Sequence, residues 1–374
     1  MNKTSFIFLI AASFSTITFG QHLVSAYRIP DILMKKHTPL YLEDYTMTPE
    51  FIPLETKPEC LLDILLQVDA DSQKIYVLDR RKNIFIFNRH GEFLNKILPE
   101  GKGPGQFVRI LGGFALFAES QRLCIYDDSQ RKLLIYNSDG KFLIEIKINI
   151  PVQKVSGLGK STLLFFTDAL YTKHAYHELS YFDISQMKFI KTLKLQAQIQ
   201  IERAQMYQQP GFTSYRDELL LRIPFCDTIF RVTSDTCIPG YIFKLGQAGI
   251  PKEIYGDLKT LENSRQRYIN FSPPVETRSF LFLPIIDHGK YLFSVLNKST
   301  GTWKIAEMPD ESETGFIYRN DSKTVFPMKR CINEFFYSTI YAHDFIDQFA
   351  KEYPGLVAKI KVDDNPIILR ARMK

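Results

Sequence analysis

Two segments of the chain carry the same pattern of strands and turns. Residues 75–94 and residues 123–143 each contain two runs of apolar and aromatic side chains, separated by a polar stretch that begins with Asp. Asp127 follows Asp79 by 48 positions, and Gly140 follows Gly91 by 49 positions in the turn after the second run. A repeat of this length with no helical pattern inside it is typical of a β-propeller blade. The repeat therefore predicts the fold, but it does not indicate a ligand or a reaction.

Each repeat predicts a four-stranded antiparallel blade. In the first blade we expect strands at residues 61–68, 75–79, 83–88 and 93–98, and the second blade repeats this order over residues 110–148. The later blades are expected at residues 162–167, 179–184 and 189–195; 218–225, 228–233 and 241–245; 291–297 and 302–308; and 316–319, 325–329 and 335–341. Blades of about 45 to 60 residues allow six to eight units, and the countable strand groups favour six. The sequence predicts an all-β, six-bladed β-propeller.

Four further segments complete this prediction. The charged and polar stretch 247–278 predicts a short helical insertion around residues 250–270, and residues 343–352 predict another short helix. Residues 50–54 and 365–372 are strand-like but belong to no complete blade. Because an open ring would expose two unpaired edges, we expect these two segments in one blade or in neighbouring ones.

The N-terminus has the pattern of a secretory signal peptide. Lys3 precedes an apolar run over residues 6–19, which ends at Gly20 and is too short to span a bilayer. We therefore predict a signal peptide at 1–20, an N-terminal extension at 21–43 and a single propeller domain at 44–374. No Cys lies near the predicted cleavage site, so lipid attachment is not expected. The predicted location is the periplasm or the cell exterior, as a soluble protein.

Composition excludes some partners. The net charge is +6, and the basic residues are dispersed rather than clustered as a nucleic acid would require. No later apolar run is long enough for a membrane span. Thirty Phe and nineteen Tyr suit stacked, aromatic-rich sheets.

Of the five cysteines, only Cys226 and Cys237 are close enough in sequence to suggest a local disulfide, and most are expected to be reduced.

Five motifs resemble those of a known family. They lie at residues 75–79, 87–94, 101–107, 227–230 and 364–369. Together they resemble the six-bladed β-propeller proteins exported by Bacteroides and relatives, a group similar to NHL-repeat proteins. The resemblance implies the propeller fold, an export route and a binding role, since no enzymatic activity is generally established for such proteins.

The sequence departs from this family at two points. Such proteins typically carry Gly-x-Gly-Pro-Gly-Glu in the first inter-blade loop, and here Gln106 replaces the acid. A metal or cationic ligand held by that carboxylate is therefore in doubt. Many members are lipoproteins, whereas this chain lacks the required Cys.

Strand order predicts which loops share a face. If the strands of a blade are labelled A to D from the inside outwards, the B-to-C and D-to-A connections leave from one end of every blade. We call that end the rim, and its Arg, Tyr and Gln side chains suit polar ligands such as sugars. The candidate ligand-binding residues are Arg80, Arg81, Gln106, Arg109, Asp128, Arg131, Tyr171 and His174. The alternative for the same residues is a solvated loop surface without a ligand.

Three other motifs favour structural roles. Gly101, Gly103, Pro104 and Gly105 could suggest a phosphate-binding loop, but Pro104 lacks an N–H and a strand follows, so a tight inter-blade crossing is expected. His174 and His177 lack a third metal ligand nearby, and residues 69–71 lack the Gly and distal Glu of a calcium loop. No catalytic residue, metal site or cofactor is predicted.

These observations favour one function over two others. The leading hypothesis is an exported, non-catalytic binding or scaffold protein of the cell envelope, expected to be a monomer, which engages a glycan, a peptide or a protein partner on its rim. The alternative is a metal-dependent hydrolase or lyase with a divalent ion in the central channel. A glycoside-active enzyme with paired carboxylates is a third possibility, because its decisive carboxylate spacing is not visible in a sequence.

Overall fold

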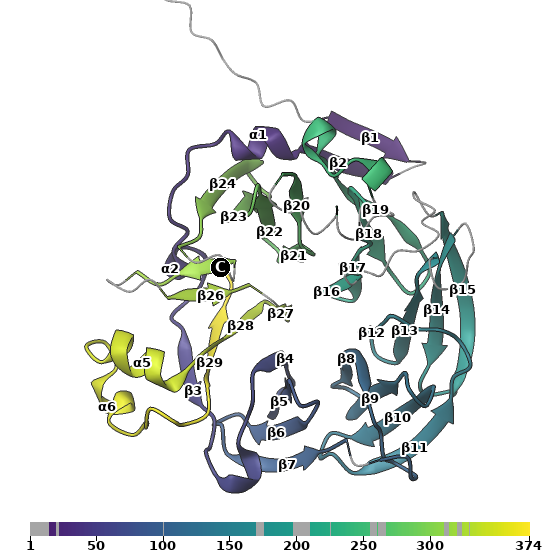
Figure 1. Cartoon of the computed structure of the whole chain (residues 1–374), viewed down its shortest axis with the longest axis vertical. Helices are drawn as coiled ribbons and strands as arrows, with labels where there is room; N and C mark the ends of the chain where they lie inside the picture. Colours follow the sequence, from purple (N-terminus) through teal and green to yellow (C-terminus); the bar gives the residue numbers. More distant parts are fainter. Residues whose placement is uncertain are drawn as a thin grey trace, which may run out of the picture.

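The computed structural model describes residues 15–19, 22–99, 101–169, 176–196, 210–224, 226–254, 260, 267–309, 314–319, 324–328 and 330–374. Six sheets stand around a central channel like the blades of a propeller (Figure 1). Neighbouring strands within each blade are antiparallel, and each blade runs from an inner strand to an outer one. The predicted all-β, six-bladed fold is confirmed.

The first three blades follow the expected four-strand order. Blade 1 contains β4 (Leu65–Ala70), β5 (Lys74–Asp79), β6 (Ile84–Asn88) and β7 (Phe93–Ile97). Blade 2 contains β8 (Ile110–Phe117), β9 (Arg122–Asp127), β10 (Lys132–Asn137) and β11 (Phe142–Lys147). Blade 3 contains β12 (Lys154–Leu158), β13 (Thr162–Thr167), β14 (Tyr176–Asp183) and β15 (Lys188–Gln196).

The next two blades carry additions. Blade 4 contains β16 (Gly211–Tyr215), β17 (Glu218–Arg222), β18 (Thr228–Val232) and β19 (Cys237–Lys244). Two N-terminal strands, β2 (His22–Arg28) and β1 (Ser15–Phe19), extend it on the outside, β2 parallel to β19. Blade 5 contains β20 (Ile269–Phe271), β21 (Val275–Glu276), β22 (Phe280–Asp287), β23 (Lys290–Asn297) and β24 (Thr302–Glu307). Here β20 and β21 pair with the same strand β22.

Blade 6 is built from both ends of the chain. Its strands are β27 (Arg330–Ile332), β28 (Phe335–Ile340), β29 (Ile367–Arg372) and the N-terminal β3 (Glu50–Pro53). Antiparallel pairing of β29 with β3 closes the ring, which confirms that the two terminal strand-like segments share a blade. The prediction that residues 316–319 and 325–329 begin this blade is wrong. They contribute to a separate two-stranded sheet, β25 (Gly315–Ile317) and β26 (Val325–Pro327), while β27 is the inner strand.

Helices are few and short. They are α1 (Ile29–Leu33), α2 (Leu42–Tyr45), η1 (Pro58–Cys60), η2 (Gly246–Ala248), η3 (Lys252–Ile254), α5 (Ala342–Phe349) and α6 (Pro354–Val357). The helix expected at 343–352 is therefore present as α5. Of the insertion expected around 250–270, η3 is helical and β20 begins at its far end, while residues 255–259 and 261–266 lie outside the described residues.

The repeated turns show why the two repeats fold alike. The Asn88 side-chain oxygen accepts the N–H groups of His90 and Glu92 at 2.9 and 3.0 Å, and Gly91 takes a φ of +87°. In the second repeat, Asn137 and Gly140 occupy the equivalent turn, where Gly140 has a φ of +82°. A side-chain cap followed by a left-handed glycine fixes a tight turn between outer strands.

Aromatic and aliphatic side chains fill the spaces between blades. Tyr126 of blade 2, for example, meets Phe165 of blade 3 edge-to-face, with ring centroids 5.7 Å apart. The thiols of all five cysteines are free, so Cys226 and Cys237 form no disulfide. None of the helices in the described ranges is both long and apolar enough to cross a membrane. The strand β1 falls within residues 1–20, for which the signal peptide remains a prediction.

Candidate binding site

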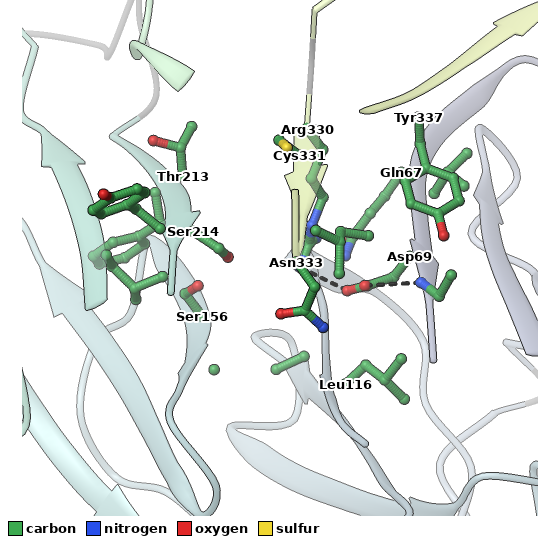
Figure 2. A pocket seen from close by; sticks show the side chains of 18 of the residues that line it. Gln67, Asp69, Leu116, Ser156, Thr213, Ser214, Arg330, Cys331, Asn333 and Tyr337 are labelled. Atoms are coloured by element: carbon green, nitrogen blue, oxygen red, sulfur yellow. Dashed lines mark hydrogen bonds and ion pairs between the residues drawn. The ribbon is translucent and has the colours of Figure 1, made fainter. Parts of the chain in front are cut away.

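The inner strands of the blades enclose a cavity along the propeller axis. Its volume is about 510 Å³, and residues of all six blades line it. Figure 2 shows Gln67, Asp69 and Arg330 on one side of this channel and Ser156, Thr213 and Ser214 on the other. The size lies within the range of small-molecule sites in proteins, which is about 300 to 1,000 Å³.

An ion pair joins two neighbouring blades inside the channel. Arg330 begins β27 of blade 6, and its Nη2 lies 2.6 Å from Oδ2 of Asp69 in β4 of blade 1. The other Asp69 oxygen accepts the N–H of Ala70 at 2.9 Å. Oδ2 itself has no hydrogen bond among the described residues, because no Arg330 N–H points at it with suitable geometry. The Asp69 side chain is 4% exposed and that of Arg330 is 32% exposed, so the arginine remains accessible from the channel.

Burial perturbs the Asp69 carboxyl group. Its loss of hydration raises the pKa of Asp69, while the Arg330 charge and the Ala70 N–H act in the opposite direction. The carboxylate is thus held in the wall chiefly by Arg330, and it neutralises one positive charge there.

A second cation lines the same channel. Lys154 begins β12 of blade 3 and is half-buried, and its Nζ has no hydrogen bond or ion pair with any other described residue. Its stem lies against Gly112, where a Cβ atom would come within 3.0 Å of the Lys154 Cδ. Burial lowers the pKa of Lys154, and the Arg330 charge lowers it further. Lysine and arginine together exceed the single Asp69 carboxylate by one positive charge.

The bulge at the start of β8 supports this wall. Gly112 and Gly113 have φ values of +77° and +94°, and the register of β8 with β9 shifts between Ile110 and Phe114. The Gln67 amide spans the junction of blades 1 and 2, donating to the Phe114 carbonyl at 3.0 Å and accepting the Phe114 N–H at 3.2 Å. Backbone and amide therefore fix this part of the channel rigidly.

A second charged cluster in the channel wall is fully paired. Glu276 accepts hydrogen bonds from Lys298 at 2.7 Å, Arg231 at 2.8 Å and the Tyr241 hydroxyl at 2.8 Å. Arg231 also donates to Glu218 at 2.6 Å. Two carboxylates and two cations balance in this cluster, so its function is to join blades 4 and 5.

The described rim residues have partners within the rim. Arg80 and Arg81 both pair with Asp63, at 3.1 and 3.2 Å, and Arg109 pairs with Asp128. Arg131 occupies a turn with a φ of +53°. Of the candidate rim residues, Arg80, Arg81, Gln106, Arg109, Asp128 and Arg131 do not line the channel. Tyr171 and His174 lie outside the described residues.

The glycine loop is tied to blade 2. The Gln106 side-chain oxygen accepts the Gly103 N–H at 3.0 Å, and Glu145 accepts the Gly105 N–H at 3.1 Å. A Cβ atom on Gly105 would approach the Phe142 ring to 2.6 Å. Both amides are thus occupied within the protein, an arrangement that suits an inter-blade crossing.

The Asp residues of the repeat also hold turns. Asp79 accepts the Asn83 N–H at 2.9 Å, and Asp127 accepts the Val108 N–H at 2.6 Å together with groups of Ser129 and Gln130. His177 accepts the Ala169 N–H at 3.2 Å and stacks on Phe166. Within the described ranges, no three His, Cys, Asp or Glu side chains form a group that could hold a metal ion.

Sequence reasoning missed the charged channel residues. The sequence pattern assigns Asp69 to a turn rather than a calcium loop, and no motif includes Lys154 or Arg330. The three lie on inner strands of three different blades, so no local spacing connects them. The sequence nevertheless contained one signal for this site: a charged residue at the beginning of an inner strand. A charged side chain is unusual in a strand that packs on apolar neighbours.

Comparisons with known proteins agree on the fold. The family described as "Domain of unknown function (DUF4934)" matches residues 27–372. A candidate exported protein of Bacteroides fragilis has a similar crystal structure, with 20% identity and a TM-score of 0.70 over 93% of this chain and 99% of that one. A member of the DUF4221 family from Bacteroides vulgatus has 12% identity and a TM-score of 0.50, over 88% and 97%. No curated protein matches.

Proposed function

Because the chain belongs to the DUF4934 family, whose function is unknown, we propose a function from the geometry of its own channel. The protein is an exported, non-catalytic binding protein of the cell envelope, and it holds a small ligand, or an extended part of a larger one, in the central channel. The expected ligand is a glycan or a peptide. The rim loops at the mouth would contact the parts of a ligand that project from the channel.

The observation that carries this proposal is the channel itself. It is about 510 Å³ in volume and is lined by backbone, Ser, Thr and charged groups from every blade. Several converging polar groups in a preformed concave site favour binding. Blade 6, closed by both chain ends, keeps the walls in place without a ligand.

Export is supported by two observations. The N-terminal segment has the signal-peptide pattern, and the structurally similar Bacteroides fragilis protein is itself a candidate exported protein. Expression of the full chain followed by cell fractionation and N-terminal sequencing tests this part. Mature protein beginning near Gln21 outside the cytoplasm is the expected result, and retention of an intact N-terminus in the cytoplasm would contradict it.

The binding role is tested by blocking the channel. Ser156 of β12 lies in the wall, and Ser156→Trp would fill the space beside it, whereas Ser156→Ala keeps the channel open. Thermal shift with a panel of oligosaccharides and peptides should find ligands that raise the Tm of wild type and Ser156→Ala, since a ligand stabilises the folded state by mass action. Ser156→Trp should fold and lose the shift. A panel without any hit, or hits that persist in Ser156→Trp, would contradict the proposal.

The metal-dependent hydrolase or lyase gains no support from the described residues. No group of three candidate ligands occurs among them, and the carboxylates of the channel wall at Asp69 and Glu276 are engaged by cations. We therefore do not pursue it.

A further inference from the structure

The charged side chains of the channel fall into two kinds of cluster. Around Glu276, each carboxylate is matched by a cation, and the hydrogen bonds are complete. The other cluster consists of Asp69, Arg330 and Lys154, and Asp69 is the one carboxylate among the described residues that forms an ion pair with either cation. The cluster of Asp69, Arg330 and Lys154 can therefore bind a further negative charge.

The two cations are placed on different walls. Lys154 belongs to blade 3 and Arg330 to blade 6, three places apart in the ring of six. Each is the first residue of its inner strand, so both backbones lie toward the end of the channel that carries the D-to-A connections. A ligand that entered from the rim would reach both residues. A group located between them would contact a lysine from one side and an arginine from the other.

We propose that this end of the channel binds its ligand through one carboxylate group, held between Lys154 and Arg330. This inference rests on the proposed function and names the chemistry of the ligand. The Arg330 side chain is partly exposed to the channel, where its N–H groups can donate to a carboxylate, and Lys154 supplies a point charge that pairs with no acid in the described ranges.

Charge matching favours a carboxylate over a phosphate monoester. The cluster has an excess of one positive charge, which a carboxylate neutralises. A phosphate monoester carries about −1.5 to −2 charges at neutral pH, which would leave negative charge next to the buried Asp69. Acidic sugars and peptide C-termini both present a single carboxylate, and the experiment separates these two sources.

The pKa of Lys154 supports the same conclusion. Burial lowers it, and the Arg330 charge lowers it further. An anion beside it reverses the second of these effects and compensates part of the first.

The test uses mature protein and five probes in isothermal titration calorimetry. D-Glucuronate and N-acetyl-alanine carry the carboxylate of a sugar and of a peptide end, and glucose and N-acetyl-alanine amide are their uncharged counterparts. We expect wild type to bind at least one acid at least tenfold more tightly than its counterpart. Inorganic phosphate serves as a third anion and should bind more weakly than the better acid.

Three variants then locate the site. Lys154→Met keeps the stem and removes the charge, so it should weaken binding of the acid at least tenfold. Asp69→Asn removes the competing carboxylate and should strengthen binding. Lys290→Met is the matched control, because Lys290 does not line the channel, is exposed and pairs with Glu307 at 3.1 Å, and it should leave affinity unchanged.

The outcomes distinguish this inference from the proposed function. Unchanged affinity in Lys154→Met, or weaker binding in a folded Asp69→Asn, would overturn the carboxylate site. If neutral ligands bind and are lost in Ser156→Trp while both acids fail, the binding function stands and the carboxylate inference is wrong. If no ligand binds at all, both proposals fail.

Discussion

The side-chain amide of Asn365 donates a hydrogen bond to the carbonyl of Cys60 at 2.9 Å, which ties the C-terminal strand to the loop after the N-terminal one. The same amide donates to the Glu55 carbonyl at 2.7 Å, and its oxygen accepts the Leu62 N–H at 3.0 Å. Asn365 is 4% exposed. Asn365 belongs to the motif at 364–369, and these hydrogen bonds give that motif a structural role, which is to join the two ends of the chain.

Asn365→Ala should therefore destabilise the whole propeller. The change removes one buried and two partly buried hydrogen bonds and leaves two carbonyls and one N–H without their partner, so we expect a loss of about 2 to 4 kcal/mol in the free energy of unfolding. Urea unfolding followed by fluorescence measures it. Asp363→Ala, two residues earlier and exposed, is the control and should cost less than about 0.5 kcal/mol. Equal stability of the two variants would contradict the role of Asn365.

Two glycines with positive φ allow steric crowding to be separated from backbone strain. A Cβ atom on Gly91 would lie 2.0 Å from the Pro53 carbonyl oxygen, whereas one on Gly159 meets nothing within 4 Å. Gly159→Ala should cost only the left-handed strain of about 1 to 2 kcal/mol. Gly91→Ala should cost clearly more, because β3 must move away from blade 1. Denaturant midpoints of both variants provide the comparison, and a smaller loss for Gly91→Ala would show that Pro53 yields without cost.

The Glu276 cluster predicts a large effect from a small change. Glu276→Gln keeps the size of the side chain but leaves Lys298 and Arg231 short of a buried countercharge. Breaking such a pair costs about 3 to 5 kcal/mol. Glu119→Gln is the matched control, since its pair with Lys160 is exposed and such pairs contribute about 0 to 1 kcal/mol. Thermal unfolding of both variants tests this, and a similar small loss in each would mean that the buried cluster contributes little.

Asp127 predicts a pH-dependent contribution to stability. Burial raises its pKa, but hydrogen bonds from Ser129, Val108 and Gln130 prevail and hold the pKa below its ordinary value of 3.8. A depressed carboxyl pKa stabilises the folded state above the unfolded value, and that stabilisation is lost as the pH falls through the folded pKa. Wild type should therefore lose stability on acidification from about pH 5 downwards, over the interval between the two pKa values.

Two exchanges assign that acid response to Asp127. Asp127→Asn should reduce the change in unfolding free energy between pH 6 and pH 3, and Ser129→Ala, which removes one donor, should reduce it less. Urea titrations at each pH supply the values. The same acid response in wild type and Asp127→Asn would assign it to other carboxylates.

The outer parts of the blades could be predicted because their signals are local. In blades 1 and 2, alternating apolar runs and the turns at Asn88 and Asn137 lie within a few residues of each other, and the observed strands begin and end close to the expected positions. The shared closing blade was also predictable, since a ring with free edges is unfavourable.

The inner strands of blades 3 and 4, β12 and β16, could not be predicted in the same way, although those of blades 1 and 2 were expected. They line a polar channel, so they lack the apolar alternation that marks a packed strand, and β16 (Gly211–Tyr215) was missed for this reason. In blade 5, Pro273 and Pro274 interrupt the inner position, because proline cannot donate to the ladder. The residues of the candidate site were the hardest to predict. Arg330 pairs with Asp69, and Lys154 lines the same channel, only because the ring brings their blades together, a relationship that no local pattern records.

The pairing of β3 with β29 sets the order of assembly. Apart from β1 and β2 on the outside of blade 4, the ribosome makes β3 before every other blade strand, yet its partner β29 follows only after all the others. Until β29 is made, β3 has no strand with which to pair in the ring. Such long-range pairing is slow to form, although the entropy of closing a longer loop grows only logarithmically. An early strand is therefore among the last to find its partner, and a chain that lacks β29 cannot close its ring.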